Sequence, residues 1–168
     1  MMVETRSWRI VEELNLELAR KAIRYVNKNI KAGSFPLIER RDVIPEETAL
    51  EWVRRYEAGE QLVAVALEGD DVIGLAHLDI RRGRGCDVAY LNVTVDAGHR
   101  RKGIGTALVR SLIEQAARRS IRRIIGKPRK ENTAAIRLLQ KLGFKIVKEV
   151  EREGKVFVVM VRGLGGEG

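Results

Sequence analysis

A chain of 168 residues that is 45% hydrophobic and 33% charged is long enough and apolar enough to bury the core of one globular domain. These proportions exclude a disordered chain, and no apolar run approaches the length that crosses a bilayer as a helix. The formal net charge of +9 leaves open an anionic partner, either a nucleic acid or a smaller phosphorylated ligand.

The distribution of the charges argues against nucleic acid as that partner. Acidic residues lie among the cations, as in 39–42 and 149–153, and three Phe and two Trp are too few for a row of base-stacking side chains. Cys86 is the single cysteine, which excludes an internal disulfide and predicts a small, half-buried apolar side chain. Because the first six residues lack the apolar core of an export signal, we expect a cytoplasmic protein without membrane attachment.

The first third of the chain predicts a short strand and two helices. Residues 7–11 are predicted to form the strand, and the helix after it ends at Gly33. The apolar stripe of this helix consists of Leu14, Leu18, Ala22, Val26 and Ile30. A loop over 33–44 then leads to a second helix, which has Pro45 in its first turn and ends near Gly59. Its side chains expected to point inward are Leu50, Val53 and Tyr56.

The middle of the chain predicts three antiparallel strands, a helix and a parallel strand. Strands over 61–67 and 72–80 flank a Glu-Gly-Asp-Asp hairpin signal, and a turn over 81–85 leads into a strand over 86–95. The next helix has Ile104, Ala107, Leu108, Leu112, Ile113 and Ala116 at helical spacing. A strand over 122–126 follows this helix, and we expect it to run parallel to the strand over 86–95 because a helix separates the two.

The last part of the chain predicts one more helix and a hairpin. The helix spans 132–142 and has Gly143 just past its end. Strands over 144–150 and 155–161 flank the turn at 152–154. Residues 163–168 are expected to form a flexible tail, which leaves one domain over residues 1–162.

The strand that ends at Val95 passes through a turn rich in glycine and cations into the helix that follows Gly103. The first N–H groups of a helix lack partners within it and the helix dipole makes that end positive, so the stretch is typical of a phosphate-binding turn. It is not a Walker loop, which needs Lys and then Ser or Thr after its last glycine, and Leu108 stands where a dinucleotide fingerprint needs a third glycine. Taken alone, the turn could equally be a connection between a strand and a helix that binds no ligand.

Two motifs resemble those of the GCN5-related N-acetyltransferases (GNAT). The Arg-x-x-Gly-x-Gly sequence over 100–105 resembles the pyrophosphate-binding motif of this family. The segment over 132–144, with its Ala-Ile pair and its Lys-Leu-Gly-Phe ending, resembles the second motif, and the two follow the order and spacing of the family. By its chemistry alone, Asn132 could cap its helix or offer its amide to a ligand, and Ala135 is small enough to let a ligand lie along the helix.

The resemblance implies an α/β (α+β) fold with a mixed, mostly antiparallel sheet, a splayed pair of parallel strands, and helices on both faces. It also implies acetyl-CoA as cosubstrate, with its pantetheine arm paired to free backbone groups near Val93 and Val95 and its pyrophosphate on the turn. The expected cofactor-binding residues are Val93, Thr94, Val95, Arg100, Arg101, Lys102, Gly103, Ile104, Gly105, Thr106, Asn132 and Ala135. No metal is expected, because two histidines and one cysteine provide no metal-ligand spacing.

The reaction implied by the resemblance is direct attack of a primary amine on acetyl-CoA, with proximity supplying much of the catalysis. The usual acid and base of the family are missing from this chain. Leu139 stands at the position of the usual Tyr and cannot donate a proton, and the usual Glu positions are Lys127 and Ala89. A backbone N–H of the strand over 86–95 could still polarise the thioester carbonyl.

Substitutes for the missing base lie on the strand over 86–95. These candidates are Asp87, Tyr90 and Asn92, the last acting through an ordered water. His77 and Asp79, on the neighbouring strand, are further candidates, although a histidine among apolar neighbours is more often a satisfied core residue. His99, in the phosphate-binding turn, is expected to serve structure or charge.

The missing acid and base leave open a second interpretation, a GNAT-fold module that binds acyl-CoA without turning it over. The acceptor, a small-molecule or protein amine, is not specified, because residues 33–44, where it would enter, carry no transferable signature. Assembly as a homodimer is also left open.

Overall fold

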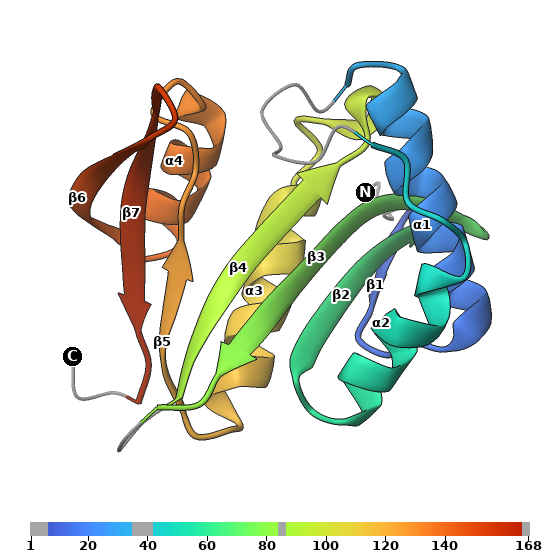
Figure 1. Cartoon of the computed structure of the whole chain (residues 1–168), viewed down its shortest axis with the longest axis horizontal. Helices are drawn as coiled ribbons and strands as arrows, with labels where there is room; N and C mark the ends of the chain where they lie inside the picture. Colours follow the sequence, from blue (N-terminus) through green and yellow to red (C-terminus); the bar gives the residue numbers. More distant parts are fainter. Residues whose placement is uncertain (1–6, 35–41, 84–86, 166–168) are drawn as a thin grey trace, which may run out of the picture.

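The computed structural model describes residues 7–34, 42–83 and 87–165, which form one mixed sheet with helices on both faces (Figure 1). The strands are β1 (Arg9–Val11), β2 (Gln61–Glu68), β3 (Asp71–Arg81), β4 (Asp87–Val95), β5 (Ile121–Gly126), β6 (Lys145–Arg152) and β7 (Lys155–Gly163). The helices are α1 (Leu16–Lys31), α2 (Thr48–Glu57), α3 (Ile104–Ala117) and α4 (Thr133–Lys141), with a short 3-10 turn, η1, at Ala97–His99. The predicted order of strands and helices is therefore confirmed.

The strands are ordered β1-β2-β3-β4-β5-β7-β6 across the sheet. β1 to β4 pair with their neighbours in antiparallel fashion, and β4 pairs with β5 in parallel, as a connection through α3 requires. β7 lies between β5 and the edge strand β6 and is antiparallel to both. The expectation of a mixed, mostly antiparallel sheet is confirmed.

The two faces of the sheet are covered by different helices. Along β2, Leu62, Ala64 and Ala66 belong to the larger core, which α3 and α4 cover, while Val63 belongs to a smaller core under α1 and α2. This alternation follows from the two-residue period of a strand. Figure 1 shows α3 behind the sheet and α1 and α2 in front of it.

One predicted core position is wrong. Leu50 is 62% exposed, whereas Ala49 is fully buried and Trp52, Val53 and Tyr56 pack beside it. α2 begins at Thr48, after a turn that contains Pro45, and its buried face includes Ala49 rather than Leu50. Positions 49, 52, 53 and 56 then share one face of the helix, and the residue after Ala49 is turned about 100° away from that face.

Some predictions fall partly on residues that are not described. Cys86 lies outside the described residues, as does the part of the predicted loop over 35–41. At the C-terminus, β7 extends through Gly163, two residues beyond the predicted strand, and the Leu164 N–H donates to the Arg122 carbonyl over 2.8 Å. Within the described ranges, no helix is long and apolar enough to cross a membrane.

α3 packs tightly against Gly74 of β3. A Cβ at this position would lie 3.0 Å from Leu108 Cδ1 and 3.1 Å from Ile104 Cγ2, and both of these side chains are buried in the larger core. The missing side chain therefore lets the first turns of α3 approach β3 closely.

Replacing Gly74 with alanine is expected to lower the free energy of unfolding by about 1–3 kcal/mol, because the new methyl group overpacks a filled core. Gly163→Ala is the matched control, since nothing lies within 4 Å of the added atom on β7, and it should change the free energy by less than about 0.5 kcal/mol. Urea denaturation measures both values. Equal stability of the two variants would contradict the close approach of α3.

Candidate functional site

β4 and β5 pair only over the first part of β4. The parallel register ends at Tyr90, opposite Ile125, and the rest of β4, Leu91 to Val95, has no partner on β5 among the described residues. Figure 1 shows the two strands side by side where they begin and apart where they end. The splayed parallel pair implied by the resemblance is thus present.

The backbone of β4 turns polar groups toward this opening. The Asp96 N–H donates to the Ile73 carbonyl over 2.8 Å, so the backbone groups at 96 point toward β3. Backbone groups alternate in direction along a strand, and those of Val93 and Val95 therefore point toward β5, which has turned away. The Arg100 Nε–H donates to the Val95 carbonyl over a long 3.4 Å. An extended ligand with amide groups can pair with this edge.

The turn between β4 and α3 is built around two residues with left-handed backbone conformation. Gly103, the N-cap of α3, has φ 83°, and Arg101 has φ 66°, which is costly for a residue with a side chain. Among the described residues, no side chain caps α3 and none in its first turn is acidic. The N–H groups at the start of α3 are therefore left for an anion, which is the arrangement that binds a pyrophosphate.

The residues predicted for the phosphate turn include exposed side chains, buried side chains, and one side chain that bonds to another segment. Arg101 and Lys102 are exposed and can meet an anionic ligand, whereas Ile104 is buried, so only its backbone N–H can serve. Arg100 donates through Nη2 to the Ser34 carbonyl over 2.7 Å, so its side chain ties the turn to the end of α1. Thr106 and Gly105 are half-buried in the first turn of α3.

On α4, the second motif has a capping residue and a core residue. Asn132 accepts a hydrogen bond from the Ala135 N–H over 3.2 Å, so the capping role is confirmed, and Ala135 is half-buried. Leu139 is 3% exposed, and a Cβ at Gly126, the last residue of β5, would lie 2.9 Å from its Cδ1. The position at which the family usually has a tyrosine is therefore a packed contact between α4 and β5.

Polar side chains gather on the face of the sheet that α1 covers. Asn92 Nδ2 lies 3.3 Å from His77 Nε2, and His77 Nε2 lies 3.6 Å from Asp79 Oδ2. His77 is partly exposed rather than a residue of the apolar core. The Lys127 ammonium lies 5.1 Å from the centre of the Tyr90 ring, at the point where β4 and β5 separate.

Asp79 is held in its ionised form. Burial opposes the charge, but hydrogen bonds from His77 and Gln61 and the charges of His77 and Arg55 outweigh it and lower the pKa of Asp79 to about 2. A carboxylate with such a low pKa is a weak base, so Asp79 is suited to orienting His77 rather than to taking a proton from an amine.

The structure does not bring Asp87 together with Asn92 and Tyr90. Asp87 begins β4, where that strand pairs with Ile121 of β5. Asn92 lies five positions further along the strand, about 16 Å away. Ala89, at one of the usual Glu positions, is fully buried in the larger core.

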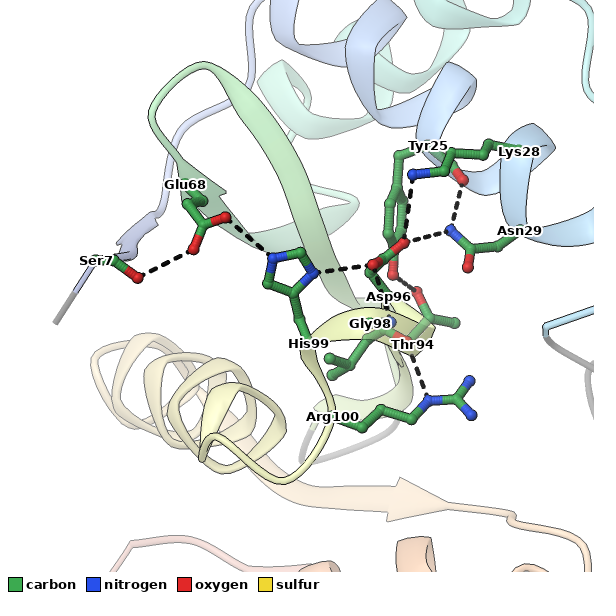
Figure 2. Close-up of polar contacts among 11 residues, drawn as sticks. Ser7, Tyr25, Lys28, Asn29, Glu68, Thr94, Asp96, Gly98, His99 and Arg100 are labelled. Carbon is green, nitrogen blue, oxygen red and sulfur yellow. Dashed lines mark hydrogen bonds and ion pairs between the residues drawn. The ribbon is translucent and has the colours of Figure 1, made fainter. Parts of the chain in front are cut away.

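A polar network behind the turn was not foreseen (Figure 2). His99 contacts Asp96 and Glu68, and Tyr25 of α1 shares a hydrogen bond with Thr94 of β4 over 3.0 Å. Burial raises the pKa of Tyr25 well above its usual range, despite the opposing hydrogen bond from Thr94. The three-residue spacing of Asp96 and His99 could have indicated their contact, but Glu68 comes from the β2–β3 hairpin, which is distant in the sequence.

Residues 27–144 match the model of the acetyltransferase (GNAT) family, which covers more than half of the chain, and the chain therefore belongs to that family. No curated protein sequence matches it.

Solved structures share the fold at low sequence identity. Ribosomal-protein-S5-alanine acetyltransferase from Vibrio fischeri is 16% identical, with a TM-score of 0.85 over 98% of this chain and 97% of that chain. YncA, a putative acetyltransferase from Salmonella typhimurium solved with its cofactor acetyl-CoA, is 20% identical, with a TM-score of 0.81 over 96% of each chain. Phosphinothricin acetyltransferase from Sinorhizobium meliloti, in complex with acetyl-CoA, is 21% identical, with a TM-score of 0.79 over 95% of this chain and 90% of that chain.

Truncation of Leu139 tests whether its position is a core contact. Leu139→Ala should lower the free energy of unfolding by about 2–5 kcal/mol, because it removes a buried side chain and leaves a cavity beside β5. The same substitution at the exposed Leu50 should change it by less than about 0.5 kcal/mol. Thermal or urea unfolding compares the two, and a Leu139 variant as stable as the Leu50 variant would refute the packed contact.

Proposed function

We propose that this protein is an acetyl-CoA-dependent N-acetyltransferase that moves an acetyl group to a primary amine by direct attack in a ternary complex. The observation that carries the proposal is the opening between β4 and β5, into which the backbone groups of Val93 and Val95 point. Membership of the GNAT family supports it, as do the neighbours solved with acetyl-CoA.

In the proposed complex, the pantetheine arm of acetyl-CoA pairs with β4 at Val93 and Val95, in the place that β5 has left. The pyrophosphate then reaches the N–H groups at the start of α3, between Arg101 and Thr106, with Lys102 beside it. The thioester lies deeper in the opening, near the polar face of β4, and a backbone N–H of that strand polarises its carbonyl.

The acceptor must lose a proton before it attacks, because a primary amine is mostly an ammonium ion at neutral pH. In our proposal a water held by Asn92 takes this proton, and His77, 3.3 Å from the Asn92 amide, lies next on the path to bulk water. Tyr90 faces the same side of β4 and borders this path. Asp87 takes no part in it, because it lies at the other end of β4.

A second candidate function is a GNAT-fold module that binds acyl-CoA without turnover. The buried Leu139 in the place of the usual tyrosine favours it, because this side chain cannot protonate the leaving thiolate. Turnover of acetyl-CoA against a panel of primary amines separates the two functions, since a binding module would retain affinity for acetyl-CoA and release no CoA with any amine.

The phosphate turn is tested by Gly105→Glu. A Cβ at Gly105 would lie 3.5 Å from Leu138 and 3.6 Å from Val95, which are ordinary contacts, so the variant should fold. Its carboxylate would occupy the anion site, and we expect affinity for acetyl-CoA, measured by calorimetry, to fall by about a hundredfold or more. Gly163→Glu adds the same charge on β7 and should bind as the wild type does. Unchanged affinity in folded Gly105→Glu would overturn the site assignment.

The proton path is tested on β4. Asn92→Ala should lower kcat by about tenfold to a hundredfold with little change in affinity for acetyl-CoA, and Tyr90→Phe should lower it less. The wild-type rate should rise with pH as the acceptor amine loses its proton. Asp79 stays ionised across this range, so its titration adds nothing to the pH profile. Full turnover in both variants, loss of turnover in Asp87→Asn, or a rate that follows a carboxylate near about pH 5 would contradict the relay.

A further inference from the structure

His99 lies between two carboxylates at the back of the phosphate turn (Figure 2). Its Nδ1 is 2.9 Å from Asp96 Oδ2, within the turn, and its Nε2 is 3.1 Å from Glu68 Oε1, at the end of β2. The ring is mostly shielded from solvent, with 21% of the side chain exposed. The imidazole therefore connects the turn to the β2–β3 hairpin, two segments that are distant in the sequence.

The geometry requires both ring nitrogens to carry hydrogen. A carboxylate oxygen only accepts hydrogen bonds, and a neutral imidazole has one N–H. In the neutral form, one ring nitrogen would turn a lone pair toward a carboxylate about 3 Å away. The imidazolium form instead makes two charge-assisted hydrogen bonds, one to Asp96 and one to Glu68.

The two carboxylates are themselves held in place. Asp96 accepts hydrogen bonds from the Gly98 N–H over 3.2 Å and from the Asn29 amide over 3.3 Å, and the Lys28 ammonium lies 3.8 Å from it. Glu68 accepts from the Ser7 hydroxyl over 3.0 Å. The network thus ties the turn to α1 and to the segment before β1, as well as to the hairpin.

The turn needs such anchors, because its conformation is strained at Arg101, two residues after His99. On the side of α1, Arg100 bonds the carbonyl groups of Ser34 and Val95. On the side of the hairpin, the anchor is His99. Loss of either anchor would let the turn relax and would move the N–H groups at the start of α3.

We propose that His99 is a positioning residue whose imidazolium, bound by Asp96 and Glu68, holds the 96–103 turn in the shape that receives the pyrophosphate, so that affinity for acetyl-CoA falls when His99 loses its proton. This inference rests on the proposed function, because it assigns acetyl-CoA to the turn.

The direction of the pH dependence follows from the groups around the ring. The hydrogen bonds from His99 to Asp96 and Glu68 raise the pKa of His99 above its usual value, against a smaller effect of burial. Burial opposes the charge of Asp96, but hydrogen bonds from His99, Asn29 and Gly98 and the charge of Lys28 together outweigh it and lower the pKa of Asp96. The pKa of Glu68 is lowered mainly by His99 and Ser7.

Both carboxylates therefore remain ionised at every pH above the usual pKa range of a carboxyl group. The stabilisation that protonated His99 provides is complete below about pH 6.5 and is lost as the pH rises through the raised pKa of His99. The other charged groups near the network do not reverse this sign. Lys28 faces Asp96 and Lys102 faces Glu68, and the buried Tyr25 keeps its proton. His99 is thus the group of the network that changes charge between about pH 6 and about pH 9.

Calorimetric titration with acetyl-CoA across this pH range tests the inference on the wild type, His99→Gln and Glu68→Gln. The wild-type Kd should increase by about tenfold from pH 6 to pH 9, the effect of about one unit of pKa difference between the bound and free protein. His99→Gln should bind weakly throughout, and its Kd relative to that of the wild type should approach one at high pH. Glu68→Gln should move the loss of affinity to lower pH, because the imidazolium has lost one partner.

The outcomes separate the two proposals. If the wild type fails to bind acetyl-CoA at every pH, the proposed function fails and the role of His99 fails with it. If the wild type binds but its Kd relative to that of folded His99→Gln is constant across pH, the positioning role is overturned while the proposed function stands. The phosphates of acetyl-CoA titrate equally in the experiments on the wild type and on the two variants, so the ratio of the wild-type Kd to the His99→Gln Kd is free of their contribution. Because Glu68 is partly exposed, its variant should fold even if a change at His99 does not.

Discussion

The separation of β4 from β5 beyond Tyr90 is the constraint on which the rest of the site depends. Backbone N–H and C=O groups in a sheet are normally paired, and leaving one buried without a partner costs about 1–3 kcal/mol. Val93 and Val95 turn such groups toward the opening, where a ligand that pairs like a strand can complete the sheet. On the far side, α4 covers the end of β5 through the contact of Leu139 with Gly126.

The turn that follows β4 depends on this same separation. It must carry the chain from the open edge of β4 into α3, whose first turns pack on Gly74. The short connection places Arg101 and Gly103 in the left-handed region, and only Gly103 adopts it without cost. The strain at Arg101, of order 1–3 kcal/mol, must be offset by contacts elsewhere. Asp96, His99 and Arg100 supply them, and each bonds a group outside the turn.

Much of the fold could be predicted from the sequence, because strands and helices follow the local periods of the apolar residues. The strands from 61 to 95 and the helix after Gly103 are clear examples. The error at Leu50 shows the limit of this reasoning, because Val53 and Tyr56 lie at helical spacing from both Ala49 and Leu50, and the pattern does not decide which of these neighbours faces the core. The position of β7 between β5 and β6, and the contact of Glu68 with His99 across 31 positions, depend on strand pairing that no local pattern encodes. The free backbone of β4 was anticipated only through resemblance to a family.

The loss of the usual tyrosine has different consequences for the two proton transfers of the proposed reaction. The leaving CoA thiolate is the conjugate base of a thiol with a pKa of about 8.5, so it departs near neutral pH with modest help from an acid. The acceptor ammonium is far less acidic, and its proton must leave before attack. A leucine at 139 has no proton to donate to the departing thiolate, which is the less demanding of the two transfers. In exchange it adds a buried contact that stabilises the junction of α4 and β5. In our proposal the remaining demand falls on Asn92 of β4 and His77 of β3, whose side-chain nitrogens lie 3.3 Å apart.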